Sequence, residues 1–124
     1  RLATIPQQFA EKNYHTSFFY VGDLGFSNMK AYVLHNGYEN IFGEDDLGSK
    51  ENFGKWGAPD EAVFDKQLSF LQSEKQPFFS YIVTSSSHEP YKVPMQTKIQ
   101  GDDGPHKFMN AACYTDLCLK KFFC

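Results

Sequence analysis

The sequence has no concentrated basic segment and no long hydrophobic run. Its 124 residues carry a formal net charge of −3, and the lysines are spread along the chain. Nucleic acid is therefore not an expected partner, because proteins that bind it usually present a dense positive surface. The longest uncharged apolar stretch, PFFSYIVTSSS, is far shorter than the ~20 residues that a membrane-spanning helix needs. These absences predict a soluble chain, and because it does not begin with methionine we expect a piece of a longer protein.

Cysteine is scarce, and Cys113, Cys118 and Cys124 all fall in one segment of helical pattern. In a helix, Cys113 and Cys118 would point about 140° apart, and Cys113 and Cys124 would lie about 16 Å apart along the axis. Neither arrangement allows a disulfide, whose Cα atoms lie within ~7 Å. The spacing also lacks the short pairs of a zinc site. We therefore expect packing thiols rather than a disulfide, a zinc site or a dithiol centre.

Aromatic residues are abundant, at 17 % of the chain, which argues against a disordered segment. Hydrophobic periodicity and turn residues predict alternating helices and strands. The first half is expected to contain a helix ending near Asn13, a strand over 17–21, a helix capped by Ser27 and ending at Gly37, and a strand over 38–42. After a solvated loop over 43–57, we expect a helix over 59–75 and a strand over 78–84. A loop over 88–104 then leads to a helix over 105–124. This alternation is typical of an α/β fold, here an αβα sandwich with a mainly parallel sheet.

The patterns also predict which faces are buried. Pro59 is expected at the first helical position of its helix, whose apolar stripe is Phe64, Leu68 and Leu71. The uncharged run after Pro77 predicts a central strand covered on both faces. The residues expected along one face of the last helix are Phe108, Ala112, Thr115, Leu119 and Phe122.

His88 follows the third predicted strand, in the segment TSSSHEPY. Ligands of parallel α/β sheets bind at the carboxyl ends of the strands, and residues 22–23 and 85–88 both fall there. A histidine ring can donate a hydrogen bond to an anionic oxygen in either protonation state, and the preceding serines suit a phosphate or sulfate. The residues alone leave two interpretations open: an anion site, or a strand-end histidine satisfied by the backbone.

Four segments in order, FFYVGDLGFSNMKAYVLHNGYEN, WGAPDEAVFDKQLSFL, PFFSYIVTSSSHEPY and NAACYTDLCLKKFF, resemble the lipoteichoic acid synthase group of the sulfatase/alkaline phosphatase superfamily. The resemblance covers nearly the whole chain. It implies that residues 1–124 form a single partial sulfatase-like domain, a fragment of an alkaline phosphatase-like fold. Enzymes of this group use a divalent metal (Mn, Mg, Zn or Ca) and transfer phosphoglycerol or related groups, and relatives hydrolyse sulfate or phosphate esters. Their substrates can be lipid-linked, and they are usually membrane-anchored with an extracytoplasmic catalytic domain.

The resemblance assigns three substrate-binding residues, His88, Asn28 and Tyr20. His88 matches the histidine that contacts the substrate phosphate, and Tyr20 stands where the group has a second histidine. Asn28 lies in Phe-Ser-Asn-Met, where lipoteichoic acid synthases have Phe-Trp-Asn-Arg. Ser27 and Met29 replace the Trp and Arg that help hold glycerol phosphate, so glycerol phosphate specificity does not follow.

Structural interpretations of these motifs stay open beside the functional ones. In the structural interpretation, Asn28 starts a helix and contacts no substrate. Likewise, Trp56-Gly57 with Asp60-Glu61 is a packing motif at the entry to a helix. Residues 102–106 can imitate a metal cluster, but the glycines and proline around Asp102, Asp103 and His106 favour a solvated turn.

The family's nucleophilic threonine in its usual surroundings and its Asp-His metal ligands are missing from this sequence. We therefore assign no catalytic residue and no metal ligand, expect no metal bound to this fragment, and expect the fragment alone to be inactive. The competing hypothesis is a non-catalytic α/β binding or structural module that has lost its active site. A fragment of a larger sheet would also expose unpaired strand edges, so self-association is a further expectation.

Overall fold

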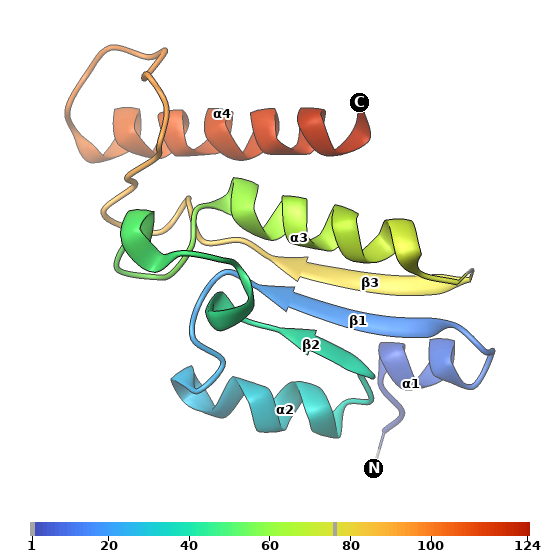
Figure 1. The fold of residues 1–124 in the computed structure, drawn as a ribbon. Coiled ribbons are helices and arrows are strands. Elements are labelled where there is room, and N and C mark those ends of the chain that lie inside the picture. The colour runs from blue at the N-terminus through green and yellow to red at the C-terminus, as the bar shows by residue number, and fades with distance from the viewer. Residues whose placement is uncertain (1, 76) are drawn as a thin grey trace.

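The computed structural model describes residues 2–75 and 77–124, and Figure 1 shows them as a ribbon. Helices and strands alternate along the chain: α1 (Ile5–Ala10), β1 (His15–Tyr20), α2 (Met29–His35), β2 (Asn40–Phe42), α3 (Asp60–Ser73), β3 (Phe78–Val83) and α4 (Gly104–Phe123). Short 3-10 turns lie at Phe26–Asn28, Glu44–Asp46 and Lys50–Asn52. None of the helices within the described residues is long and apolar enough to span a membrane.

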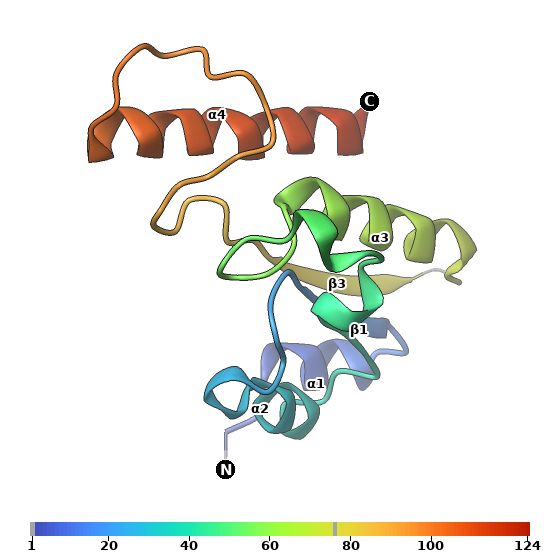
Figure 2. The same ribbon diagram turned by 60° about the vertical axis from the view of Figure 1, so that its left-hand side comes forward.

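The strands of the described residues form one parallel sheet in the order β2-β1-β3. Helices α1 and α2 lie on one face of the sheet and α3 lies on the other (Figure 1). Helix α4 packs on the outer side of α3, as both views show (Figures 1 and 2). The predicted α/β class, with a parallel sheet between helical layers, is confirmed.

Alternate side chains of β1 pack on opposite faces of the sheet. Phe19 is fully buried towards α3, where its ring stacks on Phe42 of β2 and meets the edge of Phe70. Ser17 faces the same way, and its hydroxyl donates to Ser80 of β3 at 2.8 Å. The amide of Gln67 in α3 donates to the same Ser80 oxygen, also at 2.8 Å. These two hydrogen bonds inside the aromatic core thus join α3 to β1 and β3.

Phe18 points to the opposite face, towards α1 and α2. Its ring stacks with Tyr81 at 5.8 Å between centroids and contacts Tyr38. On the same face, Phe9 of α1 stacks on Phe79 of β3 at 4.6 Å. Aromatic rings therefore fill both layers between sheet and helices, which accounts for the aromatic-rich composition.

The prediction of β3 as a strand covered on both faces is wrong for the described residues. The central strand is β1, where residues 16–19 are all buried, whereas β3 pairs with β1 alone and its Tyr81 is 49 % exposed. An uncharged run reports hydrophobicity, but it does not identify a strand's neighbours. Because the described β2 and β3 each pair on one side, self-association through these edges stays a prediction.

The predicted face of α4 is also largely wrong. The buried residues are Asn110, Ala111, Tyr114 and Cys118. Of the predicted stripe, Phe108 is 48 % exposed and Leu119 is 39 % exposed. The error is a rotation of about one residue, because aromatic and aliphatic residues occur on both sides of this helix. In α3, Phe64 of the predicted stripe is buried, whereas Leu68 and Leu71 are half-buried.

Two predicted helix starts are each displaced by one residue. Asn28, not Ser27, occupies the N-cap position of α2, and both have positive φ angles, 56° and 51°. Asparagine tolerates this left-handed conformation better than most residues. Pro59 occupies the N-cap position of α3, so Asp60 is the first helical residue. The three cysteines are free thiols: Cys118 is buried as expected of a packing thiol, Cys113 is half-buried, and Cys124 is exposed.

Candidate functional site

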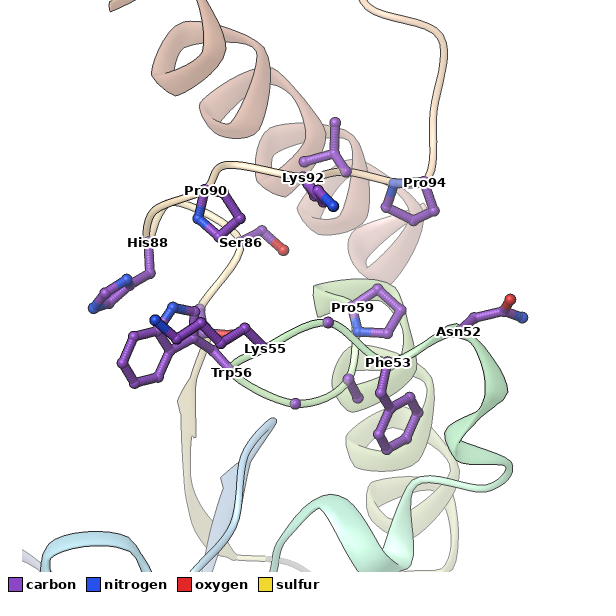
Figure 3. A pocket seen from close by; sticks show the side chains of 15 residues that line it. Asn52, Phe53, Lys55, Trp56, Pro59, Ser86, His88, Pro90, Lys92 and Pro94 are labelled. Carbon is purple, nitrogen blue, oxygen red and sulfur yellow. The ribbon is translucent and has the colours of Figure 1, made fainter. Parts of the chain in front are cut away.

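The carboxyl ends of β1 and β3 lie at the same edge of the sheet, because the two strands pair in parallel. Residues 84–91 follow β3 at this edge, and residues 54–59 lead into α3 beside them (Figure 3). Gly57 lets the second segment lie directly on the end of β1: its φ is 117°, and a Cβ atom there would collide with the Val21 carbonyl oxygen. The Ala58 amide donates to that oxygen at 2.8 Å. This close approach brings Trp56 to the carboxyl edge.

Residues 84–91 form a turn that presents His88 at the surface. The His88 amide donates to the Ser85 carbonyl, and the Tyr91 amide donates to the His88 carbonyl, both at 2.9 Å. The His88 imidazole lies against Trp56, with ring centroids 4.1 Å apart and 43° between the ring planes. His88 itself is exposed rather than packed inward. An imidazole in this position can meet a ligand at the edge of the sheet.

The two ring nitrogens of His88 have different surroundings. Nδ1 lies 3.1 Å from the Glu89 carbonyl oxygen, which also accepts the indole N–H of Trp56 at 2.6 Å. A protonated Nδ1 donates to this carbonyl, which leaves Nε2 for a ligand. The contact with Glu89 therefore orients the ring without occupying both of its nitrogens.

The carboxyl group of Asp60 supports the same turn from the start of α3. Asp60 is fully buried, and its Oδ1 accepts the backbone amides of Ser85 and Ser86, each at 3.1 Å. Its Oδ2 accepts the hydroxyl of Thr115 in α4 at 2.6 Å. A carboxylate is also favoured in the first turn of a helix. One side chain thus connects α3, α4 and the His88 turn.

A cavity of about 470 Å³ opens between the two segments. Figure 3 shows the side chains around it. The lining residues are Asn52, Phe53, Gly54, Lys55, Trp56, Gly57, Ala58, Pro59, Ser85, Ser86, His88, Pro90, Lys92, Val93 and Pro94. Of these described lining residues, none is acidic and two are lysines. The cavity therefore favours an anionic group, with an apolar wall available for an organic substituent.

Lys55 and Trp56 add a second feature to the cavity. The Lys55 ammonium lies 5.0 Å from the centroid of the Trp56 ring, within the range of a cation–π contact. Trp56 consequently contacts both a cationic side chain and the His88 imidazole. This arrangement gathers hydrogen-bond donors and positive charge around one aromatic ring.

The structure places the three predicted substrate-binding residues unequally. His88 lines the cavity, but Tyr20 and Asn28 are not among its described lining residues. Asn28 is exposed at the start of α2, and the neighbouring Phe26 meets Trp56 edge-on at 6.2 Å between centroids. The turn that carries Asn28 therefore adjoins the site, and the roles of Asn28 and Tyr20 stay predictions.

Tyr20 ends β1 in a half-buried position. Burial raises the pKa of its hydroxyl, and the nearby negative charges of Asp23 and Glu44 raise it further. The hydroxyl therefore stays protonated at neutral pH and is available as a donor.

Asp103 and His106 form the cap of α4. The Asp103 carboxylate accepts the His106 amide at 3.0 Å and also pairs with the His106 ring. These contacts, the backbone hydrogen bond first, lower the pKa of Asp103. Asp102 is exposed beside them, but the solvated-turn interpretation is wrong for Gly104 to His106, which form the first turn of α4 behind the N-cap Asp103. Across residues 2–75 and 77–124, no group of three or more His, Cys, Asp or Glu side chains is placed to hold a metal ion, and the described residues do not fit the divalent metal implied by the resemblance.

Three residues of the site were not singled out from the sequence. Lys55 and Lys92 lie in polar loop segments, where nothing in the pattern separates them from other surface lysines. Asp60 received no role in the site, because its buried contacts with residues 85 and 86 depend on the tertiary fold. The signal for Asp60 was the Trp56-Gly57 and Asp60-Glu61 motif, which was interpreted as helix-entry packing.

A family model described as sulfatase matches residues 1–123. The chain belongs to the sulfatase family. Lipoteichoic acid synthase 1 of Bacillus subtilis (strain 168) is 28 % identical over 127 residues, covering 97 % of this sulfatase chain and 20 % of the relative. Lipoteichoic acid synthase 2 of the same strain is 25 % identical over 129 residues, covering 98 % of this chain and 20 % of the relative. The chain thus spans about a fifth of the length of these curated relatives.

Solved structures agree with this assignment. A protein in the alkaline phosphatase superfamily from Vibrio parahaemolyticus superposes with a TM-score of 0.80 at 36 % identity, covering 96 % of this sulfatase chain and 30 % of that protein. The lipoteichoic acid synthase LtaP from Listeria monocytogenes gives a TM-score of 0.85 at 21 % identity, covering 95 % of this chain and 31 % of that one, and supports the fold alone. The family resemblance drawn from four sequence segments is confirmed.

Proposed function

We propose that this sulfatase chain supplies part of the substrate pocket of an extracytoplasmic, metal-dependent phosphotransferase or ester hydrolase. The observation that carries the proposal is the position of His88, which rests on Trp56 at a cavity that also contains Lys55 and Lys92. The substrate is a phosphate or sulfate ester, in which an anionic group is joined to an organic substituent.

In the proposal, His88 acts in its doubly protonated form, which donates from Nδ1 to the Glu89 carbonyl and from Nε2 to a non-bridging oxygen of the ester. The two lysines raise the local concentration of the anion, since opposite charge in a cleft attracts ligands over several ångströms. Phe53, Pro59 and Val93 contact the organic substituent. A donor aimed at developing negative charge lowers the barrier more than it strengthens substrate binding.

The curated relatives are named as lipoteichoic acid synthases, so transfer of phosphoglycerol or a related lipid-linked head group is the leading specific reaction. By the family resemblance, Ser27 and Met29 stand where lipoteichoic acid synthases carry Trp and Arg. The loss of the planar Arg donor removes a strong phosphate contact. The proposal therefore extends to other phosphodiesters and to sulfate esters.

We assign the attacking group and the divalent metal to other parts of the whole protein, because the sequence lacks the family's threonine motif and the described residues contain no group placed to hold a metal ion. The metal would supply Lewis-acid activation in such an enzyme. The contribution of this chain is to bind and orient the ester. The membrane anchor and the extracytoplasmic location are likewise proposals for the whole protein.

The test compares His88→Ala with wild type in the full-length protein, with bis(p-nitrophenyl) phosphate and p-nitrophenyl sulfate as substrates and Mn²⁺ or Mg²⁺ added. Removal of one donor to a developing oxyanion typically lowers kcat by about 10²–10³-fold, and we expect a loss of that order. His15→Ala is the matched control. His15 starts β1 at the opposite edge of the sheet, so its loss should leave turnover unchanged.

Equal turnover of His88→Ala and wild type would overturn the assignment. A full-length protein that binds inorganic sulfate or phosphate through His88 but turns over no ester with any metal would instead support the non-catalytic binding module.

A further inference from the structure

We infer that Asp60 and Trp56 are positioning residues for His88. Together they hold the two ends of the turn that carries the imidazole. The inference rests on the proposed function, because it assigns how the substrate-contacting ring is kept in place.

Asp60 holds the beginning of the turn. Its Oδ1 accepts the amides of both Ser85 and Ser86 at 3.1 Å, which fixes two successive peptide groups. Ser86 is buried, and Asp60 is wholly inaccessible to solvent, so water cannot easily replace these hydrogen bonds. A buried amide without an acceptor is unfavourable. The turn therefore keeps this geometry only while an acceptor occupies the position of Asp60.

Trp56 holds the end of the turn. Its indole N–H donates to the Glu89 carbonyl at 2.6 Å, and its ring lies against the His88 imidazole. The same Glu89 oxygen lies 3.1 Å from His88 Nδ1. Trp56 thus fixes both the backbone after His88 and the plane of the ring.

Asp60 and Trp56 belong to one short segment that is itself tied to the sheet. The Ala58 amide, between them, donates to the Val21 carbonyl at the end of β1. The position of His88 is consequently fixed relative to the carboxyl end of β1, and it does not depend on the exposed loop alone. A rigid support of this kind matters because a shift of about 1 Å in a catalytic group can lower the rate about 10²-fold.

The contact of Asp60 with α4 does not explain this arrangement by itself. Only Oδ2 serves the helix pair, through Thr115, whereas Oδ1 serves the His88 turn alone. A second α3–α4 link is made next door, where Lys121 pairs with Glu61. Asp60 and Glu61 are therefore adjacent carboxyl groups that both contact α4, but only Asp60 also contacts the His88 turn.

The experiment uses the full-length protein with four substitutions: Asp60→Ala, Asp60→Asn, Glu61→Gln and Trp56→Phe. In Asp60→Ala, we expect kcat for bis(p-nitrophenyl) phosphate or p-nitrophenyl sulfate to fall by about 10²-fold with little change in KM. Asp60→Asn should recover most of this loss, because its amide oxygen can still accept from residues 85 and 86. Glu61→Gln makes the same carboxyl-to-amide change one residue away and should leave kcat unchanged. Trp56→Phe keeps a ring under His88 but loses the bond to Glu89, and should lower kcat about tenfold.

A second readout is independent of activity. The Trp56 ring shifts the imidazole resonances of His88 in an NMR spectrum with labelled histidine. Asp60→Ala and Trp56→Phe should move these resonances, whereas Glu61→Gln should not. If Asp60→Ala fails to fold, Trp56→Phe carries both measurements.

The outcomes separate the two proposals. If His88→Ala lowers turnover but neither Asp60→Ala nor Trp56→Phe changes kcat or the His88 resonances beyond Glu61→Gln, the positioning role is overturned and the proposed function stands. If the His88 resonances move as expected but His88→Ala retains full turnover, the supports are real and the proposed function is overturned.

Discussion

The imidazole of His88 lies 4.1 Å from the indole ring of Trp56, and the two residues come from different loops at the carboxyl edge of the sheet. The indole N–H also binds the carbonyl of Glu89. A histidine that follows a strand can be held by its own backbone; here Nδ1 lies 3.1 Å from the neighbouring Glu89 carbonyl oxygen, and Trp56 from a second loop supports the ring as well. That relationship supports a ligand-binding position at an exposed ring rather than a buried structural one.

The two cavity lysines should govern the affinity for anions. We expect the double variant Lys55→Gln/Lys92→Gln to weaken binding of inorganic sulfate or phosphate about three- to tenfold, since exposed charge pairs contribute roughly 0.2–1 kcal/mol each. The salt dependence of binding should also decrease. Calorimetric titration at low and high salt measures both effects. The double variant Lys12→Gln/Lys107→Gln, which removes two exposed lysines that do not line the cavity, serves as the charge-matched control, and a loss as large in that variant would contradict the assignment.

The hydrogen bonds of Ser80 should contribute measurably to stability. Ser80→Ala leaves the Ser17 hydroxyl and the Gln67 amide without their common partner, so we expect the free energy of unfolding to fall by about 1–3 kcal/mol. Urea denaturation measures the change. The control is Ser69→Ala on the exposed side of α3, which should lie within about 0.5 kcal/mol of wild type. Similar values for both variants would show that the polar contact adds nothing to the core.

The cap of α4 should depend on pH. Contacts with His106 lower the pKa of folded Asp103 below its ordinary value. An acid whose pKa is lower in the folded state than in the unfolded state stabilises the fold when the pH is above the unfolded-state pKa, which is about 3.9 for aspartate. This stabilisation is lost as the pH falls through the pKa of the folded state. We therefore expect protection of the first α4 amides against hydrogen exchange to decrease in acid below about pH 4. Asp103→Asn keeps a capping oxygen and should flatten this dependence; an unchanged acid profile in that variant would exclude Asp103 as its source.

Much of the fold was predictable because its determinants are local. The Pro59-Asp60 helix start and the periodic Phe64 stripe locate α3 to within a residue of its observed start. The face of α4 was not predictable in the same way, because Phe108 and Leu119 are as apolar as the residues that are buried. Which side of such a helix packs inward depends on the partner helix, and the sequence of α4 alone does not contain that information.

The candidate site was also predictable only in part from the sequence. His88 could be found because it follows a strand in a family-like segment, and strand ends are where α/β sheets bind ligands. Asp60 could not, because an acidic residue in the first turn of a helix has a sufficient local explanation. Its bonds to residues 85 and 86 join positions 25 and 26 residues apart in the sequence, a relationship that only the fold reveals.

The most direct measurement follows the His88 imidazole itself while an anion is added. NMR spectra of the full-length protein with labelled histidine, titrated with inorganic sulfate or glycerol phosphate, should show saturable shifts of the His88 resonances, while those of His15 at the opposite edge of the sheet stay in place. If His88 does not respond at concentrations that saturate the protein, or responds no more than His15, the imidazole does not contact the anionic group and the proposed pocket is contradicted.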